Sequence, residues 1–424
     1  MLPMNRWITM LLLVVLLLSA CQPVQVAAPG AAGVSVPAVQ GQPHQARPDA
    51  PPYAVRGSYA VGVRDFTIAG TQAYSRALTV SVWYPALNPS GAPEAVTYAM
   101  DITPGGDYPA VPVYGRAIQD AVPVTDGAPF PLVLYSHGGW SFRQSAAYLV
   151  EHLASFGFVV IAPDHVDNWG TLFQSSLAAE ILRPIELRRT LDYAEQLTAQ
   201  GGALEGLIDM AQVAAAGWSF GGEEAMLLAG ARFNLDELFA GCQAKDNVFA
   251  GCEYQEHVDE LVALAGLNML PQGLWPDWRD PRIDAVVALA PGADMFGKTG
   301  TQEMQAPILL IAGSLDESVG PALAYFDTYR RLPGTRKSLV TVANASHLIF
   351  FNACSANPGV VDEGLYWVCS DPVWDMDRAH DLINHFVTAF LLAELKGDTE
   401  AAKALAPENV TFPGIQYETT AYGK

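Results

Sequence analysis

The feature that most constrains the fold is the stretch "VAAAGWSFGGE" at residues 213–223. Small and apolar residues lead directly into Ser219, which lies between Gly217 and Gly221. The pattern Gly-x-Ser-x-Gly is typical of a sharp turn from a strand into a helix, with the serine strained and its hydroxyl projecting above the sheet edge. Side chains at the flanking positions would collide with the neighbouring strand and helix, so glycine is favoured there. A pattern this short also arises as a glycine-rich turn of no consequence, so the rest of the chain must support the prediction.

Segments typical of strands and helices alternate along the chain. The strand-like segments are 77–87, 132–135, 158–164, 212–217, 283–292, 306–314 and 337–347. Helical spacing of apolar residues predicts helices over 145–157, closing at Gly157, over 184–200, opening at Pro184, over 219–231 and over 375–395. The first strand alternates and predicts one wetter face. The others are apolar throughout, which indicates an α/β fold with a mostly parallel central sheet and helices on both faces.

Residues 233–282 interrupt this alternation with a cysteine pair, many acidic residues and the run "LPQGLWPDWRDP". We predict an inserted cap between the helix after Ser219 and the next strand. A neutral structural insertion is the alternative, because long insertions are not always functional. The alternation on both sides predicts one domain over 53–424.

The N-terminus has the anatomy of an export signal. Arg6 precedes the apolar run 8–18, and "LSAC" ends at Cys21. The run is shorter than the roughly 20 apolar residues of a membrane span. "LSAC" resembles the lipobox of bacterial lipoproteins, which implies removal of the preceding residues, a lipid anchor on Cys21 and a location outside the cell membrane. An ordinary secreted protein is the alternative. Residues 22–52 carry almost no charge and predict a disordered tether.

The net charge of −21 argues against nucleic acid as a partner, because phosphate binding needs clustered lysine and arginine. Four cysteines remain after Cys21, and an even number in an exported protein favours disulfides. We prefer the local pairs Cys242–Cys252 and Cys354–Cys369, since each pair lies within one irregular segment. A metal site is the alternative, but the spacing of these cysteines is not that of metal ligands.

If Ser219 is a nucleophile, it needs a base and an acid that orients the base. On this fold the chain order is serine, then aspartate or glutamate, then histidine. Asp316 follows one buried strand and His347 the next, so both lie at the carboxyl ends where open α/β sheets bind ligands. We therefore predict Ser219, Asp316 and His347 as a triad. Asp294, which follows the preceding strand, is an alternative acid.

Acyl transfer also needs backbone N–H groups for the developing oxyanion. The residue after the serine, Phe220, supplies one, and we predict Gly139 in "SHGGW" as the other. His137 is interpreted as a turn residue beside this loop. We expect Glu223 and Glu224 to complement the dipole at the start of the helix.

Aromatic residues near the strand ends are candidates for an apolar acyl pocket, although core packing explains such residues as often. They are Trp140, Phe142, Trp169, Phe350 and Trp367.

Together, "LYSHGGWSFRQSAAYLVEHLASFGFVVIAPDH", "GWSFGG", "PILLIAGSLDESV" and "NASH" resemble the bacterial relatives of plasma-type platelet-activating-factor acetylhydrolase, and the dienelactone-hydrolase-like and polyester-hydrolase lipases. The resemblance implies an α/β-hydrolase fold and a serine esterase that needs no metal or organic cofactor. It implies the same triad, with oxyanion donors at Gly139 and Phe220. Trp218 precedes the serine as in polyester hydrolases, where the acetylhydrolases carry histidine. The acetylhydrolases also place their acid near Asp294.

The sequence therefore predicts an ester hydrolase acting on a short-chain or lipid-like ester, either a small molecule or a lipid. Two alternatives remain. One is a catalytically silent surface lipoprotein that binds a ligand, because fold alone does not prove function. The other is a peptidase on the same fold.

Overall fold

The computed structural model describes residues 47–72, 74–100, 111–165, 174–243, 250–319, 323–334 and 336–423. These residues belong to a single compact unit. The predicted export signal, Cys21 and most of the predicted tether lie outside the described residues. Among the helices of the described part, none combines the length and apolarity needed to cross a bilayer.

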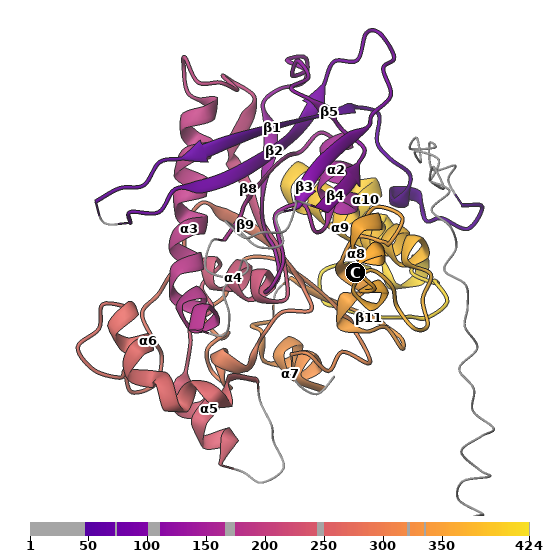
Figure 1. Cartoon of the computed structure of the whole chain (residues 1–424). Helices are drawn as coiled ribbons and strands as arrows, with labels where there is room; N and C mark the ends of the chain where they lie inside the picture. Colours follow the sequence, from indigo (N-terminus) through magenta and orange to yellow (C-terminus); the bar gives the residue numbers. More distant parts are fainter. Residues whose placement is uncertain are drawn as a thin grey trace, which may run out of the picture. The chain divides into compact units, whose positions relative to one another are not determined.

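In the described part of the chain, a ten-stranded sheet forms the centre of the fold (Figure 1). Its neighbours from β7 through β6, β8, β9 and β10 to β11 are parallel, whereas β2 runs antiparallel to both β1 and β7, and β12 runs antiparallel to β11. In sheet order the strands are β12 (Ile415–Thr419), β11 (Lys337–Val342), β10 (Ile308–Gly313), β9 (Ile283–Leu289), β8 (Ile208–Trp218), β6 (Phe130–Ser136), β7 (Val159–Pro163), β2 (Leu78–Ala86), β1 (Ala60–Ile68) and β5 (Ile118–Gln119). A separate hairpin consists of β3 (Val96–Met100) and β4 (Val111–Gly115).

Helices cover both faces of the sheet, as β6 illustrates. Val133 and Tyr135 belong to the core on the face of α2 (Ala147–Ser155) and α9 (Met376–Lys396). Leu132 and Leu134 belong to the core on the face of α3 (Gln174–Thr198) and α4 (Phe220–Leu228). Successive side chains of a strand point to opposite faces, so a strand covered twice must be apolar throughout. The predicted α/β fold with a mostly parallel, doubly covered sheet is confirmed.

The prediction of one wetter face for the first strand was wrong. The strand is β2, and along it only Thr79 is exposed. The reason is its place in the sheet, between β1 and β7, with α2 packed against it. Its alternation of β-branched and polar residues therefore does not correspond to a solvent-facing side.

The helix predicted to open at Pro184 begins earlier, and Pro184 lies inside α3. A proline within a helix removes one backbone hydrogen bond and usually kinks or ends it. Here buried polar contacts hold the helix on both sides of the proline. Before it, the Tyr254 hydroxyl donates to Glu180, and after it, a carboxylate oxygen of Glu186 lies 2.5 Å from Nδ1 of His165. Tertiary contacts thus outweigh the local preference.

The segment between α4 and β9 folds into α5 (Leu235–Cys242), the 3-10 turn η2 (Ala250–His257) and α6 (Val258–Leu264). The structure joins Cys242 to Cys252, which links α5 to η2, and α6 lies beside α3 (Figure 1). Trp275 and Trp278, from the predicted run of residues 270–281, pack against Phe233. This segment is therefore a packed insertion, and a role as a cap stays a prediction.

The long helix α9 has a defined cap at each end. Asp375 caps α9 by accepting a hydrogen bond from the Arg378 N–H, and Gly397 ends it with a φ of 65°. The remaining helices and turns are η1 (Pro52–Ala54), η3 (Asp294–Phe296), α7 (Leu323–Arg331), η4 (His347–Phe350), α8 (Pro358–Asp362), η5 (Tyr366–Val368), α10 (Thr399–Ala404) and η6 (Pro407–Asn409).

Candidate active site

Ser219 occupies the turn between β8 and α4, at the carboxyl end of a central strand. Its φ of 58° and ψ of −121° are uncommon for a residue other than glycine. Such a backbone conformation costs roughly 1–3 kcal/mol and persists only where the surroundings enforce it. The side chain is 8% exposed. Strain of this kind at a strand-to-helix turn is typical of a nucleophilic serine.

The glycines around Ser219 are explained by close backbone contacts. A Cβ atom added at Gly217 would lie 2.2 Å from the carbonyl oxygen of Gly221. One added at Gly221 would lie 2.0 Å from the carbonyl oxygen of Ser136, at the end of β6. Because both obstacles are backbone atoms, a side chain at either position would displace β6, β8 or α4 from one another.

His347 and Asp316 are in direct contact. The Nδ1 atom of His347 lies 2.7 Å from Oδ2 of Asp316. Asp316 follows β10 and is 1% exposed, and His347 follows β11 and is 9% exposed. The Tyr325 hydroxyl of α7 donates to the same carboxylate oxygen at 2.7 Å, and the Ser318 N–H donates to the other at 3.0 Å. Both oxygens of the carboxylate therefore accept hydrogen bonds, and one of them also contacts the imidazole.

The His347 turn is also bound to the serine turn. The Trp218 indole N–H donates to the His347 carbonyl oxygen at 3.2 Å, and the two rings lie 5.3 Å apart between centroids. Because Trp218 directly precedes Ser219, this contact brings the two predicted residues to the same edge of the sheet. Asp371 supports the turn by accepting hydrogen bonds from the Ser346 N–H and hydroxyl, both at 2.8 Å.

The alternative acid, Asp294, lies on a different loop from Asp316. It begins η3, after β9. Its charge contributes to the raised pKa of Tyr325, after burial and Asp316, and to that of Glu223, after burial and the nearby glutamates. Asp316, the preferred acid, contacts His347 directly.

The predicted oxyanion loop follows β6. His137 is fully buried, and its Nδ1 atom lies 2.8 Å from the Gly138 carbonyl oxygen. Trp140, the next residue after Gly139, has a backbone φ of 57°. Phe220 is the first residue of α4, so its N–H is one of those that the helix itself does not use. Gly139 therefore lies on the loop after β6, and Phe220 lies at the N-terminal end of α4, as the sequence predicts.

Glu223 and Glu224 lie near the start of α4, and Glu224 differs from the expected role. Both are buried, and they belong to a polar network on the α3 side of α4. The Ser136 hydroxyl donates to Glu224 at 2.5 Å and lies 3.0 Å from Nε2 of His165. Burial raises the pKa of Glu224 to about 8, so this group is largely uncharged at neutral pH. A largely uncharged Glu224 does not complement a helix dipole as a charged residue would, and the expectation of dipole complementation was wrong for it.

The candidate pocket aromatics separate into two groups. Phe142 and Phe350 are buried members of the α2–α9 core. Trp140 and Trp367 are each 64% exposed. Trp169 lies outside the described residues.

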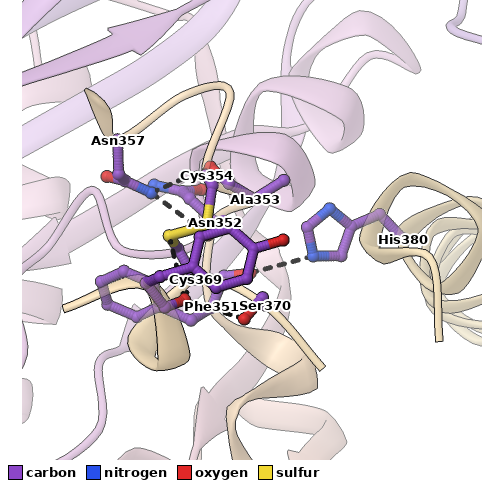
Figure 2. Close-up of a disulfide and its surroundings, with 9 residues drawn as sticks. Phe351, Asn352, Ala353, Cys354, Asn357, Cys369, Ser370 and His380 are labelled. Atoms are coloured by element: carbon purple, nitrogen blue, oxygen red, sulfur yellow. Dashed lines mark hydrogen bonds between the residues drawn. A yellow bond between two sulfur atoms is a disulfide. The ribbon is translucent and has the colours of Figure 1, made fainter. Parts of the chain in front are cut away.

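The segment after η4 is held by the second disulfide. The structure joins Cys354 to Cys369, so both cysteine pairs are the local ones preferred from the sequence. Figure 2 shows how side chains fix this segment: the Asn357 amide donates to the carbonyl oxygen of Asn352 at 3.1 Å, and a His380 ring nitrogen lies 2.9 Å from that of Phe351. This cross-linked segment directly follows η4, the turn that begins at His347.

Comparison with known proteins agrees with this fold. Residues 114–199 match the model of the platelet-activating factor acetylhydrolase, isoform II, family. A ferulic acid esterase from Streptomyces cinnamoneus has a similar solved structure, with a TM-score of 0.55 and 22% identity, covering 87% of this chain and 98% of that one. The chain has the α/β-hydrolase fold. No curated protein matches it in sequence.

The resemblance predicted from the sequence is confirmed by this family match and this fold. The matched family and the similar structure are both ester hydrolases by name. The matched residues include Gly139 but end before Ser219, Asp316 and His347. The roles of those three residues therefore rest on their geometry.

Sequence reasoning missed several groups that hold the site. Tyr325 and Asp371 lie in segments without a recognisable motif, and no signal pointed to them. A signal did exist for Arg183: Glu180, Arg183 and Glu186 recur at every third position. That spacing places three charges along one face of a helix that is otherwise expected to be apolar there.

Proposed function

We propose that the chain is a serine hydrolase of carboxylic esters, with Ser219 as nucleophile, His347 as general base and Asp316 as the group that orients the base. The observation that carries this proposal is the 2.7 Å contact between His347 and Asp316, on a turn that is hydrogen bonded to the residue before Ser219. The strained backbone of Ser219 supports it, because a chain tolerates such strain where it serves a site.

In the proposed reaction the Ser219 oxygen attacks the ester carbonyl carbon while its proton passes to Nε2 of His347. Asp316 stabilises the imidazolium and keeps Nδ1 protonated. The N–H groups of Gly139 and Phe220 donate to the carbonyl oxygen as it becomes negative. The imidazolium then protonates the leaving alcohol, and a water molecule activated by His347 releases the acid from the acyl-enzyme. These steps use only groups of the chain, water and the ester.

The proposed substrate is an ester of a small molecule or a lipid, with a short or lipid-like acyl chain. The family match to an acetylhydrolase supports a short acyl group, and the ferulic acid esterase is an alternative guide. A net charge of −21 disfavours strongly anionic polymers. We also propose that the protein is exported and lipid-anchored at Cys21. Two disulfides agree with an oxidising compartment, where such bonds persist.

The test is hydrolysis of p-nitrophenyl esters of increasing acyl length by the wild type and by Ser219→Ala. The proposal predicts turnover that Ser219→Ala abolishes while its melting temperature stays near that of the wild type. Parallel amide substrates separate an esterase from a peptidase. Folded wild-type protein that hydrolyses none of the esters contradicts the proposal and favours a catalytically silent binding protein. A Ser219→Ala variant that hydrolyses them as well as the wild type also contradicts the proposal, because the activity then does not depend on Ser219.

A further inference from the structure

Helix α3 directs one positive charge into the interior of the protein. The Arg183 side chain is 0% exposed, and a buried charge is costly unless it is paired and hydrogen bonded. Its Nη1 atom lies 3.3 Å from Oε1 of Glu224 on α4. The same Nη1 donates to the His137 carbonyl oxygen at 2.8 Å, and Nη2 donates to the Gly138 carbonyl oxygen at 3.4 Å. Arg183 therefore connects the helix after Ser219 with the loop after β6.

The contact with the Gly138 carbonyl constrains the neighbouring N–H group. The carbonyl of Gly138 and the N–H of Gly139 belong to one planar peptide unit, and this unit is trans. In a trans unit the C=O and N–H bonds point in opposite directions. A donor that holds the Gly138 oxygen therefore turns the Gly139 N–H away from α3. His137 holds the same oxygen from a second side, with its Nδ1 atom 2.8 Å away.

Arg183 also touches the residue that supplies the other proposed donor. Its guanidinium carbon lies 5.5 Å from the centre of the Phe220 ring. A guanidinium at this distance is attracted to an aromatic ring. One side chain thus contacts the peptide unit of Gly139 and the side chain of Phe220, the two residues that carry the proposed oxyanion donors.

We propose that Arg183 is a positioning residue that sets the direction of the oxyanion donors without contacting the substrate. The inference rests on the proposed function, since it assigns a task within that reaction. It predicts a specific defect. Loss of Arg183 weakens stabilisation of the negative oxygen in the transition state and leaves binding of the uncharged ester largely intact.

The experiment compares Arg183→Met with Arg188→Met, a matched control on the same helix whose guanidinium donates to the Arg279 carbonyl oxygen. Each variant is assayed with p-nitrophenyl acetate and with the thionoester in which sulfur replaces the carbonyl oxygen. Sulfur is larger and a weaker acceptor, so the wild type should prefer the oxygen ester. For Arg183→Met we expect kcat on the oxygen ester to fall about tenfold to hundredfold with KM little changed. The preference for oxygen over sulfur should shrink by a similar factor, and Arg188→Met should keep it.

General damage to the fold lowers both rates together and leaves the ratio of oxygen ester to thionoester unchanged. An unchanged ratio in a folded Arg183 variant therefore overturns the inference. Arg183→Lys provides a second variant if Arg183→Met does not fold, because it keeps the charge beside Glu224 but has one ammonium group for two carbonyls. We expect it to reduce the ratio as well, to a smaller extent. Failure of the proposed function is a separate result, namely activity that does not depend on Ser219.

Discussion

Two histidine–carboxylate pairs in the described part of the chain have nearly the same local geometry but different surroundings. His347 contacts Asp316 at 2.7 Å, and His165 contacts Glu186 at 2.5 Å. His165 even has a serine hydroxyl, that of Ser136, at 3.0 Å from its other ring nitrogen. By distances alone, the second group also resembles a serine–histidine–acid triad.

The difference lies in exposure and in the backbone of the serine. Ser136 ends a regular strand, and its hydroxyl donates a hydrogen bond to Glu224. His165 is fully buried, and burial together with the charge of Arg183 holds its pKa well below the usual range. A general base must accept a proton during the reaction, and such surroundings oppose that charge. Contact with a carboxylate therefore identifies a histidine as a general base only where an accessible serine with a strained backbone lies beside it.

The largest expected effect separates the two histidines. His347→Ala should lower kcat for ester hydrolysis by about 10⁶-fold, as removal of a general base from a triad does. His165→Gln should leave kcat within about tenfold, because its ring does not touch the reacting atoms, and should lower the melting temperature instead. Steady-state assays and thermal melts of both variants measure the contrast. An equal loss of kcat in folded His165→Gln would contradict the assignment of the general base to His347.

The next effect distinguishes the carboxylates. Asp316→Asn should lower kcat by about 10⁴-fold, because the amide favours the wrong tautomer of His347. Asp294→Asn, the matched control from the neighbouring loop, should have a much smaller effect on kcat. Kinetics with p-nitrophenyl acetate measure both. A larger loss for Asp294→Asn would transfer the role of the acid to that residue.

A smaller effect concerns the support of the acid. Tyr325→Phe removes the hydroxyl that donates to Asp316 at 2.7 Å and leaves the ring in place. Because a single hydrogen bond to a charged group contributes about 1.5–3 kcal/mol, kcat should fall by roughly tenfold or somewhat more. The variant's kcat relative to wild type measures this, and an unchanged kcat would mean that Ser318 and His347 suffice to hold the carboxylate.

The smallest effect is a pH dependence of stability, and it belongs to the buried network of His165. Burial raises the pKa of Glu224 from 4.5 to about 8, so the folded protein retains a proton that the unfolded chain releases. This contribution to stability is complete below about pH 4.5 and is lost as the pH rises towards 8. Glu224→Gln cannot lose a proton. Its melting temperature should therefore rise relative to the wild type between pH 5 and pH 8, and a constant difference over that range would contradict the assignment.

The sequence predicted the parts of the molecule that have a period or a fixed order. The continuous apolar strands predicted the doubly covered sheet, because every residue of such a strand is buried. The order of Ser219, Asp316 and His347 predicted which loops meet. Contacts between distant segments left no local pattern. The sequence predicts a helix start at Pro184 because the residues that hold α3 around it, Tyr254 and His165, lie outside the helix. Tyr325 supports Asp316 from a helix that no motif identified.

The central claim is that Ser219, and not the triad-like Ser136, is the nucleophile. A fluorophosphonate reacts with an activated serine and forms a covalent bond that survives digestion. Labelling the folded protein and identifying the modified peptide by mass spectrometry therefore tests the claim directly. The account predicts one labelled serine, Ser219, with labelling abolished in His347→Ala and retained in His165→Gln. A label on Ser136, or labelling of Ser219 that persists without His347, would contradict it.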